Sequence, residues 1–399
     1  TELGAKAILV CSNTSPASLG GIDRAADDLR DLGALAREFD IQVGFEALAW
    51  GRHISDYRDA WEAVRRADHP NVGVILDSWH MLAKGLSPDA MRAIPADRIT
   101  FVQIADAPKM DMDLLQWSRH FRCFPGQGDL PIKGFMEALA ATGYDGWLSH
   151  EIFNDRFRMA SPRRIAEDGE RSLVNLLGRT KQGAPLPPAP ATEGVAFIEF
   201  AVSEKDAEGL SALFRAMGFA LTGRHKSKQV QRWTQGEINL IVNCEPDGFA
   251  HAHYITHGPS VAAVGLWVGD AGVQMDRAEA LLAQAFRQKT GPGELAIPAI
   301  RGVGGSLIHM LDRKTDLGRV WELEFEPTEP AAHGALTRVD HIAQSVFFEE
   351  LPTWRLFYAS IFDFERSPAV DVADPAGLVE SEVLRSPDRS VQIALNGSS

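Results

Sequence analysis

The sequence predicts an α/β chain in two parts, a (β/α)8 barrel followed by α+β modules of the βαβββ type. Through the first 180 residues, short apolar runs alternate regularly with amphipathic stretches. Four of these runs carry an acidic or amide residue near their ends, at spacings close to the barrel repeat of about 31 residues. A Pro/Ala-rich stretch, residues 180–193, predicts an extended linker, after which short strands, glycine turns and helices follow one another.

The elements of the first part follow from its apolar runs and their flanking residues. We expect strands at 4–12, 41–48, 72–78, 99–106 and 146–153, and helices at 21–39, 131–142, 161–178 and from an N-cap at Ser55. A further short strand is expected at 122–126, because a helix follows it. Six strands are two fewer than a closed barrel needs, and an open barrel would expose its edges. The sequence therefore predicts that about two βα units precede Thr1 in the natural protein.

Four polar residues near strand ends are candidate metal ligands. Glu46, Asp77, Gln103 and Glu151 lie in the runs VGFEAL, VGVILDSWH, ITFVQIADA and GWLSHEIF. Their spacings are 31, 26 and 48 residues (77−46, 103−77, 151−103). These spacings fit a barrel in which the first three residues lie on three successive strands and the fourth lies two strands further on. Each residue alone could be a buried or capping polar group, but four in phase favour metal ligation. Carboxylate and amide oxygens are hard ligands, which favours a divalent cation such as Mg, Mn or Co.

Five motifs carry a family resemblance. GFEALAWGRHIS, LDSWH, FVQIADAP, FPGQGDLP and LSHEIFND resemble the sugar-phosphate isomerase/epimerase superfamily of xylose-isomerase-like TIM barrels. Within that superfamily they are most similar to the bacterial 3-dehydroshikimate dehydratases. The resemblance covers nearly all of residues 1–180 and implies a divalent metal held at four strand ends. Gln103 stands where many members have His, which makes the site harder and less attractive to zinc.

The resemblance also implies candidates for catalysis and substrate binding. His80 follows the second ligand by three residues, as in the family's DxxH pattern, and the ordinary pKa of His suits a general acid or base; helix capping is the alternative. His53 and Arg52 follow the first ligand strand, either beside the substrate or on a surface loop. A substrate with a carboxylate needs a guanidinium clamp and hydroxyl donors, for which we single out Arg122 and Ser118.

The implied reaction is metal-dependent dehydration of 3-dehydroshikimate to protocatechuate, a hydro-lyase step of quinate and shikimate catabolism. The metal would act as a Lewis acid towards the ketone. The alternative is a sugar or inositol epimerase, isomerase or dehydratase of the same superfamily, because a shared fold does not fix the substrate. Such an enzyme would need hydroxyl-binding residues more than an arginine clamp.

The second part contains a weak internal repeat. GVAFIEFAV (194–202) matches RVDHIAQSV (338–346) at a spacing of 144 residues (338−194). Each copy continues with a helix that contains a Leu-Phe pair and ends in a strand that terminates at Asn. We therefore expect a first module at 194–336 and a shortened second module at 337–399, and take 1–179 as the barrel domain.

Three stretches of this part, HGPSVAAVGLWVGDA, IRGVGGSLIHMLDR and RVDHIA, resemble 4-hydroxyphenylpyruvate dioxygenases, which have a vicinal-oxygen-chelate fold. Those enzymes bind Fe(II) through two His and one Glu. His341 matches the first His, whereas Phe197 stands at the equivalent place in the first module. The second part is therefore expected to be a binding or oligomerisation module, through which the chain could form a homo-oligomer, rather than an active dioxygenase.

Composition narrows the class of protein. The 399 residues are 45% hydrophobic and 24% charged, as in ordinary globular proteins. A formal net charge of −14 without a basic tract argues against nucleic acid or an anionic membrane as partner. The expected partner, a small-molecule carboxylate, is what the resemblance to the dehydratases implies. Three cysteines without a CxxC pair fit a reducing cytoplasm.

Overall fold

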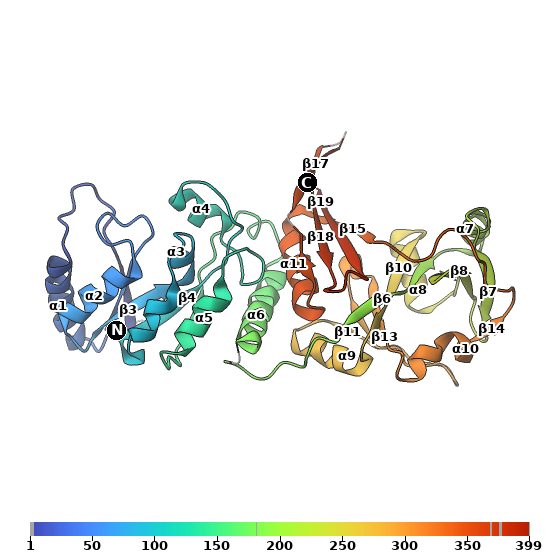
Figure 1. Ribbon diagram of the computed structural model, residues 1–399, viewed down its shortest axis with the longest axis horizontal. Helices are drawn as coiled ribbons and strands as arrows, with labels where there is room; N and C mark the ends of the chain where they lie inside the picture. The colour runs from blue at the N-terminus through green and yellow to red at the C-terminus, as the bar shows by residue number, and fades with distance from the viewer. Residues whose placement is uncertain (1–3, 181, 368, 375–376, 399) are drawn as a thin grey trace. The chain divides into compact units, whose positions relative to one another are not determined.

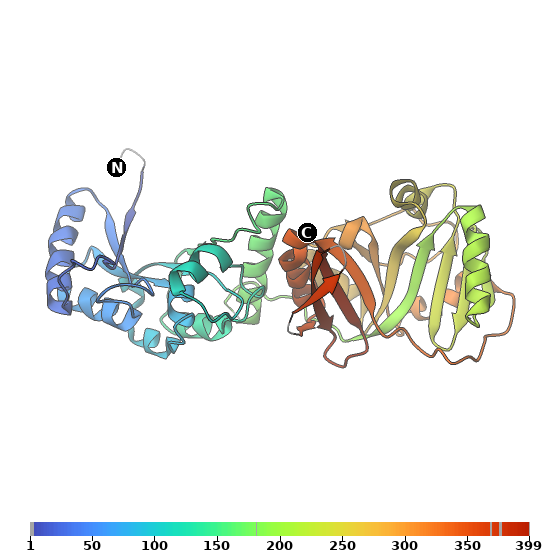
Figure 2. The same ribbon diagram turned by 90° about the horizontal axis from the view of Figure 1, so that it is seen from above.

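The computed structural model describes residues 4–180, 182–367, 369–374 and 377–398 (Figures 1 and 2). The chain divides into two compact units with the boundary between Pro185 and Leu186, and each is described by itself. Residues 182–191 carry no helix or strand. None of the helices within the described residues combines the length and the apolar character that crossing a lipid bilayer requires.

The first unit is built on one parallel sheet with its strands in chain order. These strands are β1 (Ala7–Cys11), β2 (Gln42–Glu46), β3 (Val72–Asp77), β4 (Ile99–Ile104) and β5 (Leu148–His150). The helices are α1 (Ile22–Glu38), α2 (Tyr57–Ala67), α3 (Ser78–Leu82), α4 (Leu114–Phe121), α5 (Ile132–Ala140) and α6 (Pro162–Arg179). Short 3-10 helices η1 (Pro88–Ala93) and η2 (Ala96–Arg98) lead into β4.

Alternating side chains divide this sheet into two faces. Every second residue is apolar and fully buried against the covering helices: Val43 and Phe45 on β2, Val72, Val74 and Leu76 on β3, and Val102 and Ile104 on β4. These side chains pack with α1, α2 and α5, which contribute Leu29, Val64 and Phe135. Because neighbouring residues in a strand point to opposite faces, the intervening residues point away from these helices. The polar strand-end residues belong to that second set.

Two predictions for this unit were wrong. Residues 122–126 form no strand; Cys123 makes only an isolated bridge with Asp106. The carboxylate of Asp106 instead accepts hydrogen bonds from the backbone N–H groups of Gly126 and Gly128, which holds this segment as a loop. β5 consequently pairs directly with β4, so Glu151 follows the neighbouring strand rather than one two further on. Helix α2 is capped by Asp56, whose carboxylate accepts from Arg58 N, and not by Ser55.

The second unit contains two further sheets. The first has the order β11-β12-β13-β10-β6-β9-β8-β7-β14, and the second has the order β15-β19-β18-β16 with β17 paired to β18. The strands are β6 (Thr192–Ala201), β7 (Ala220–His225), β8 (Val230–Gln235), β9 (Ile238–Asn243), β10 (Ser260–Val268), β11 (Ala285–Phe286), β12 (Ala299–Arg301), β13 (Leu307–Leu311), β14 (Phe325–Pro327), β15 (Ile342–Phe347), β16 (Glu365–Arg366), β17 (Val370–Asp374), β18 (Gly377–Arg385) and β19 (Gln392–Ser398). The helices are α7 (Glu204–Ala216), α8 (Gly248–His257), α9 (Ala271–Ala280), α10 (Val320–Glu324) and α11 (Leu351–Ile361), with 3-10 turns η3 (Val303–Gly305), η4 (Asp316–Arg319) and η5 (Phe348–Glu350).

The internal repeat is visible in the strand register. β6 runs parallel to β9 with Ala201 opposite Asn243, and β15 runs parallel to β19 with Ser345 opposite Asn396. Ala201 and Ser345 are 144 residues apart (345−201), the spacing of the sequence repeat. In each copy a helix follows the first strand, α7 in one and α11 in the other. The weak sequence match therefore reflects two equivalent strand pairings.

Candidate active site

Strand register places the polar strand-end residues on one face of the first sheet. Glu46 at the end of β2 lies opposite Cys11 and Ile75, and Asp77 comes two residues after Ile75. Asp77 lies opposite Gln103 on β4. Steps of two residues keep a side chain on the same face of a strand, so these polar groups all point away from the covering helices.

Glu151 extends this set by one strand. Gln103 lies opposite Ser149 on β5, and Glu151 comes two residues later. The backbone N–H of Glu151 donates to Ile104 O at 3.4 Å, which continues the strand pairing beyond the end of β5. All four residues singled out from the sequence thus lie at the carboxyl ends of adjacent parallel strands.

Three of the polar side chains form a compact group. Glu46, Asp77 and His80 each offer a ligand atom, and these atoms all lie within 4.8 Å of one another. His80 Nε2 is 3.7 Å from Glu46 Oε1 and 3.9 Å from Asp77 Oδ2. The three residues are 3%, 2% and 4% exposed, respectively, so the group is removed from solvent. Such a group could hold a divalent metal ion.

Asp77 joins this group to α3. Its Oδ1 accepts hydrogen bonds from the backbone N–H groups of Trp79 at 2.6 Å and His80 at 3.2 Å, so it is the N-cap of α3. The strand β3 ends at Asp77 and the helix begins at Ser78. This tight strand-to-helix turn brings the His80 ring back over the strand end, which explains the spacing of three residues.

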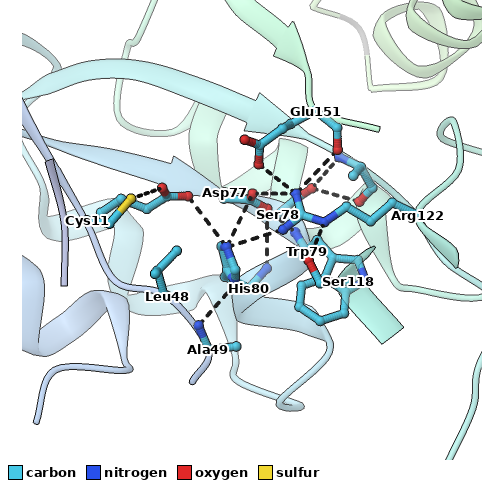
Figure 3. A network of polar contacts seen from close by, with 12 residues as sticks. Cys11, Leu48, Ala49, Asp77, Ser78, Trp79, His80, Ser118, Arg122 and Glu151 are labelled. Atoms are coloured by element: carbon cyan, nitrogen blue, oxygen red, sulfur yellow. Dashed lines mark hydrogen bonds and ion pairs between the residues drawn. The ribbon is translucent and has the colours of Figure 1, made fainter. Parts of the chain in front are cut away.

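Arg122 is the cation of the site. Its Nη1 lies 2.9 Å from Asp77 Oδ2 and 2.8 Å from Glu151 Oε2 (Figure 3). Its Nε donates to Ser118 Oγ at 3.0 Å, and its guanidinium lies 4.8 Å from the centroid of the Trp79 ring. The Arg122 side chain is 1% exposed. Two carboxylates, one hydroxyl and an aromatic face thus fix the position of a buried guanidinium.

Both ring nitrogens of His80 lie close to N–H groups, and Nδ1 is the one that accepts a hydrogen bond. The backbone N–H of Ala49 donates to Nδ1 at 3.0 Å, and Arg122 Nη2 lies 3.2 Å from Nε2 (Figure 3). Trp50 contacts the ring edge-on with a centroid distance of 5.0 Å. Burial lowers the pKa of His80 to about 4, although the charge of Asp77 acts against it. The ring is therefore neutral at physiological pH.

The carboxylates of the site have pKa values moved in different directions. Burial, and then the charges of Asp77 and Glu151, raise the pKa of Glu46 to about 8. Burial also raises the pKa of Glu151, together with the charge of Asp77. Burial acts in the same direction on Asp77, but Arg122 and His80 outweigh it, and the pKa of Asp77 is lowered. Without a further cation the site therefore retains a proton that a metal ion would displace.

Two buried oxygen atoms of the strand-end ligand candidates lack a hydrogen-bond partner among the described residues. They are Glu46 Oε1 and Gln103 Oε1, and both belong to residues that the sequence singled out as ligands. Buried acceptors are normally paired, since desolvation without a partner is costly. A carboxylate oxygen and an amide oxygen left open in this way fit a hard divalent cation.

The remaining candidates take different places. Ser118 is buried and bonded to Arg122. His53 and Arg52 lie on an exposed loop, where His53 Nε2 lies 3.0 Å from Ser18 O and Arg52 N donates to Asn13 O. Within the described part of the chain, neither side chain shares a hydrogen bond or an ion pair with the carboxylate group. A catalytic role for His53 and a substrate-binding role for Arg52 stay predictions.

Sequence reasoning missed three residues that shape the site. Cys11 Sγ lies 3.4 Å from Glu46 Oε2, and its place directly opposite Glu46 in the register would have revealed it. Trp79 supports Arg122, a contact that no local pattern signals. Asp106 accepts from four backbone N–H groups and orders the loop after Arg122; burial raises its pKa to about 6.

Comparisons with known proteins agree with this architecture. Residues 1–176 match the family described as xylose isomerase-like TIM barrel, and residues 188–326 match the family described as hydroxyphenylpyruvate dioxygenase (HPPD), N-terminal. A solved structure described as a xylose isomerase-like TIM barrel/4-hydroxyphenylpyruvate dioxygenase fusion protein superposes with a TM-score of 0.90 at 45% identity, over 100% of this chain and 65% of that chain.

The chain is therefore similar to a xylose isomerase-like TIM barrel in its first part and to the N-terminal part of an HPPD in its second. It is 45% identical to the 3-dehydroshikimate dehydratase of Pseudomonas putida and 44% identical to that of Pseudomonas aeruginosa, over 99% of its own length in both cases. The chain spans 64% of the length of each of these relatives.

Phe197 and His341, which match each other in the internal repeat of the HPPD-like part, lie in different surroundings. Phe197 lies within β6 and is buried. His341 immediately precedes β15 and is exposed, with Nδ1 2.8 Å from Asp340 Oδ2. The first module thus has an aromatic side chain where the resemblance expects a metal ligand, and iron binding by His341 stays a prediction.

Proposed function

We propose that the chain carries the catalytic centre of a 3-dehydroshikimate dehydratase, a hydro-lyase that forms protocatechuate in the catabolism of quinate and shikimate. The observation that carries the proposal is the buried group of Glu46, Asp77 and His80 with Arg122 beside it. The named activity of the relatives at 45% and 44% identity supports the choice of substrate.

Glu46, Asp77, Gln103 and Glu151 would hold a divalent cation, for which Mg, Mn and Co are the candidates. When bound, the cation supplies Lewis-acid polarisation of the substrate ketone. The two open acceptor atoms, on Glu46 and Gln103, support this ligand set. An amide in place of an imidazole makes the site less suited to zinc.

His80 is the group that moves a proton. Nδ1 accepts from Ala49 N–H, so the proton exchanges at Nε2, the nitrogen nearest the carboxylates and Arg122. Since Nδ1 is occupied, the neutral ring carries its proton on Nε2; it can donate this proton to the ring hydroxyl, which leaves as water, and Nε2 is reprotonated by the proton removed next to the ketone. Trp50 and the backbone of Ala49 fix the orientation of the ring, so little reorganisation is needed.

Arg122 and Ser118 bind the substrate carboxylate in this proposal. Arg122 balances the charges of Asp77 and Glu151. A bound divalent cation would also balance these carboxylates, which would leave guanidinium N–H groups of Arg122 for a substrate anion. Ser118 holds Nε of Arg122 and keeps the guanidinium plane fixed. Sugar or inositol substrates lack a carboxylate, so this buried arginine favours the dehydratase over that alternative.

The test is turnover of 3-dehydroshikimate by the metal-stripped chain, followed through the absorbance of the aromatic product, before and after addition of Mg, Mn or Co. Product formation that depends on added metal supports the proposal. Absence of product with every metal, together with turnover of a sugar or inositol, would replace it with the epimerase or isomerase reading. Glu46→Gln serves as a variant that should remain inactive with metal.

Three subsidiary proposals accompany the main one. The three free cysteines support a reducing, cytoplasmic location. The second unit is proposed to serve as a binding or oligomerisation module, and light scattering of the purified chain tests the oligomer. We also keep the predicted domain limits, 1–179, 180–193 and 194–399, as a proposal that limited proteolysis would test.

A further inference from the structure

The HPPD-like unit encloses a cavity of about 490 Å³ on the face of its larger sheet opposite α7. Aromatic side chains form much of its wall: Phe197, Phe286, Trp321 and Phe325. Two polar residues, Glu199 and His309, line it as well. Cavities of this size and mixed character typically hold small organic ligands.

The strands explain why these side chains share one space. Phe197 and Glu199 are two residues apart on β6, so both point to the same face. His309 on β13 and Phe197 on β6 both lie opposite Gly265 of the intervening strand β10. A Cβ atom on Gly265 would come within 2.3 Å of the Phe197 ring, so this glycine makes room for the ring beside His309.

Glu199 is a carboxylate without a countercharge. Its Oε1 accepts from Asn243 Nδ2 at 2.7 Å, and within the described residues no Lys, Arg or His lies at ion-pair distance from it. The nearby Lys228 pairs with Glu294 instead, at 2.8 Å. Burial raises the pKa of Glu199, although the hydrogen bond from Asn243 and the charge of Lys228 act against it.

His309 is the second polar group on this face, and one of its ring nitrogens is unpaired among the described residues. Its Nδ1 is buried and makes no hydrogen bond with any described residue. Its ring lies beside Phe197, with a centroid distance of 5.7 Å. Burial lowers the pKa of His309 to about 4, so the ring is neutral and can donate one hydrogen bond and accept another.

Other polar groups on the cavity wall already have partners. Glu324 Oε2 lies 3.2 Å from His225 Nε2, and its Oε1 accepts from Leu295 N at 2.6 Å. Glu294 is bonded to Lys228 and to Ser227. Glu199 and His309 are wall groups that a ligand could bond, and both sit beside an aromatic surface.

We propose that this cavity binds a small uncharged aromatic compound that carries a hydroxyl group. The ring packs against Phe197, Phe286 and Trp321, and the hydroxyl group bonds to Glu199 and His309. A hydroxyl group can both donate and accept, which suits a carboxyl and a neutral imidazole together. A cation would face Lys228 on the same wall, and an anion would face Glu199. The inference concerns the second unit and does not rest on the function proposed for the first.

The test compares two probes of the same shape on the intact chain. The probes are 4-methylphenol and 1,4-dimethylbenzene, in which a methyl group replaces the hydroxyl, and binding is followed by ligand-observed NMR. We expect saturable binding of 4-methylphenol that is about tenfold tighter than that of the hydrocarbon. Glu199→Leu and His309→Phe should each remove most of this tenfold preference, whereas Glu326→Gln on an exposed strand position should keep it.

Fluorescence places the binding in the cavity. Trp321 lines it, so 4-methylphenol should change the emission of the chain, and Trp321→Phe should remove that change. Thermal melting of each variant shows whether it is folded. If a variant does not fold, the preference of the unmodified chain for 4-methylphenol over 1,4-dimethylbenzene still tests the proposal. Absence of saturable binding of 4-methylphenol, equal binding of both probes, or tighter binding of benzyltrimethylammonium would each overturn the proposal.

Discussion

Replacing Arg122 with Met should destabilise the metal-free first unit strongly. The change removes a guanidinium that is 1% exposed and that bridges Asp77 at 2.9 Å and Glu151 at 2.8 Å. The Asp77 side chain is fully buried, so its carboxylate cannot recover the lost interaction from water. Breaking one side of a buried ion pair costs about 3–5 kcal/mol of unfolding free energy.

The assay is thermal unfolding of metal-stripped Arg122→Met beside the unmodified chain. In a unit of this size each kcal/mol lowers Tm by about 2–4 °C, so the first unfolding transition should fall by roughly 6–20 °C. A divalent cation at about 100 times its Kd adds about 2.7 kcal/mol to either protein. Because the carboxylates of the variant lack their cation, the metal should raise its Tm by more than that of the unmodified chain.

A matched control uses another buried arginine of the same unit. Arg171 pairs with Asp168 at 2.5 Å, and the two side chains are 6% and 1% exposed. Arg171→Met should also lower Tm, but added metal should raise its Tm only as much as that of the unmodified chain. The reasoning fails if metal stabilises the two variants equally, or if metal-free Arg122→Met melts with the unmodified chain.

Three further predictions concern single side chains of the site. Gln103→Leu should leave the metal-free protein as stable or slightly more stable, because it removes a buried acceptor that has no partner. The same change should weaken metal binding at least about tenfold in calorimetric titration. A loss of stability without a loss of metal affinity would contradict a ligand role for Gln103. His80→Gln should lower kcat by about 10²–10⁴-fold with metal content unchanged by elemental analysis; loss of the metal would make His80 a ligand instead. The pKa of Glu46 is raised from 4.5 to about 8 in the folded unit, so the stability that protonated Glu46 contributes is fully present below pH 4.5 and is lost as pH rises through 8. The pKa of His80 is lowered from 6.5 to about 4, so the stability that neutral His80 contributes is fully present above pH 6.5. Between pH 6.5 and about 8 the metal-free unit should therefore lose stability through Glu46, and chemical denaturation of Glu46→Gln should show this dependence reduced.

The strands β2 and β3, which carry Glu46 and Asp77, were predictable because they are buried on both faces. Apolar residues on the helix side make runs such as VGVILD easy to recognise, and β2 and β3 end at Glu46 and Asp77. The spacing between these residues follows from the length of one strand–helix unit. The position of Gln103 opposite Asp77 is a consequence of the same regularity.

The segment after β4 broke the regular spacing. The helix that follows residues 122–126 led us to expect a strand there, but the buried carboxylate of Asp106 accepts backbone hydrogen bonds that a strand would have given to a neighbour. A residue about 20 positions away in sequence thus decides the local conformation. Patterns within a short window cannot show such a competition.

The contacts of Arg122 were not predictable for a similar reason. The sequence marked it as a clamp for a substrate, whereas the structure brings it to Asp77 and Glu151, 45 and 29 residues away. Its partners depend on how two loops fold over the strand ends. Phe197 in the second unit shows the opposite case, since its place in the repeat, together with the resemblance of His341 to a dioxygenase ligand, indicated that a ligand was missing there.

Titration of the metal-stripped chain with Mn²⁺, while formation of protocatechuate from 3-dehydroshikimate is followed, tests the central claim most directly. We expect no turnover without metal, a rise with added Mn²⁺ that saturates at one ion per chain, and no such rise in Glu46→Gln. Equal turnover with and without metal, or an unchanged titration in Glu46→Gln, would contradict a metal centre at these strand ends.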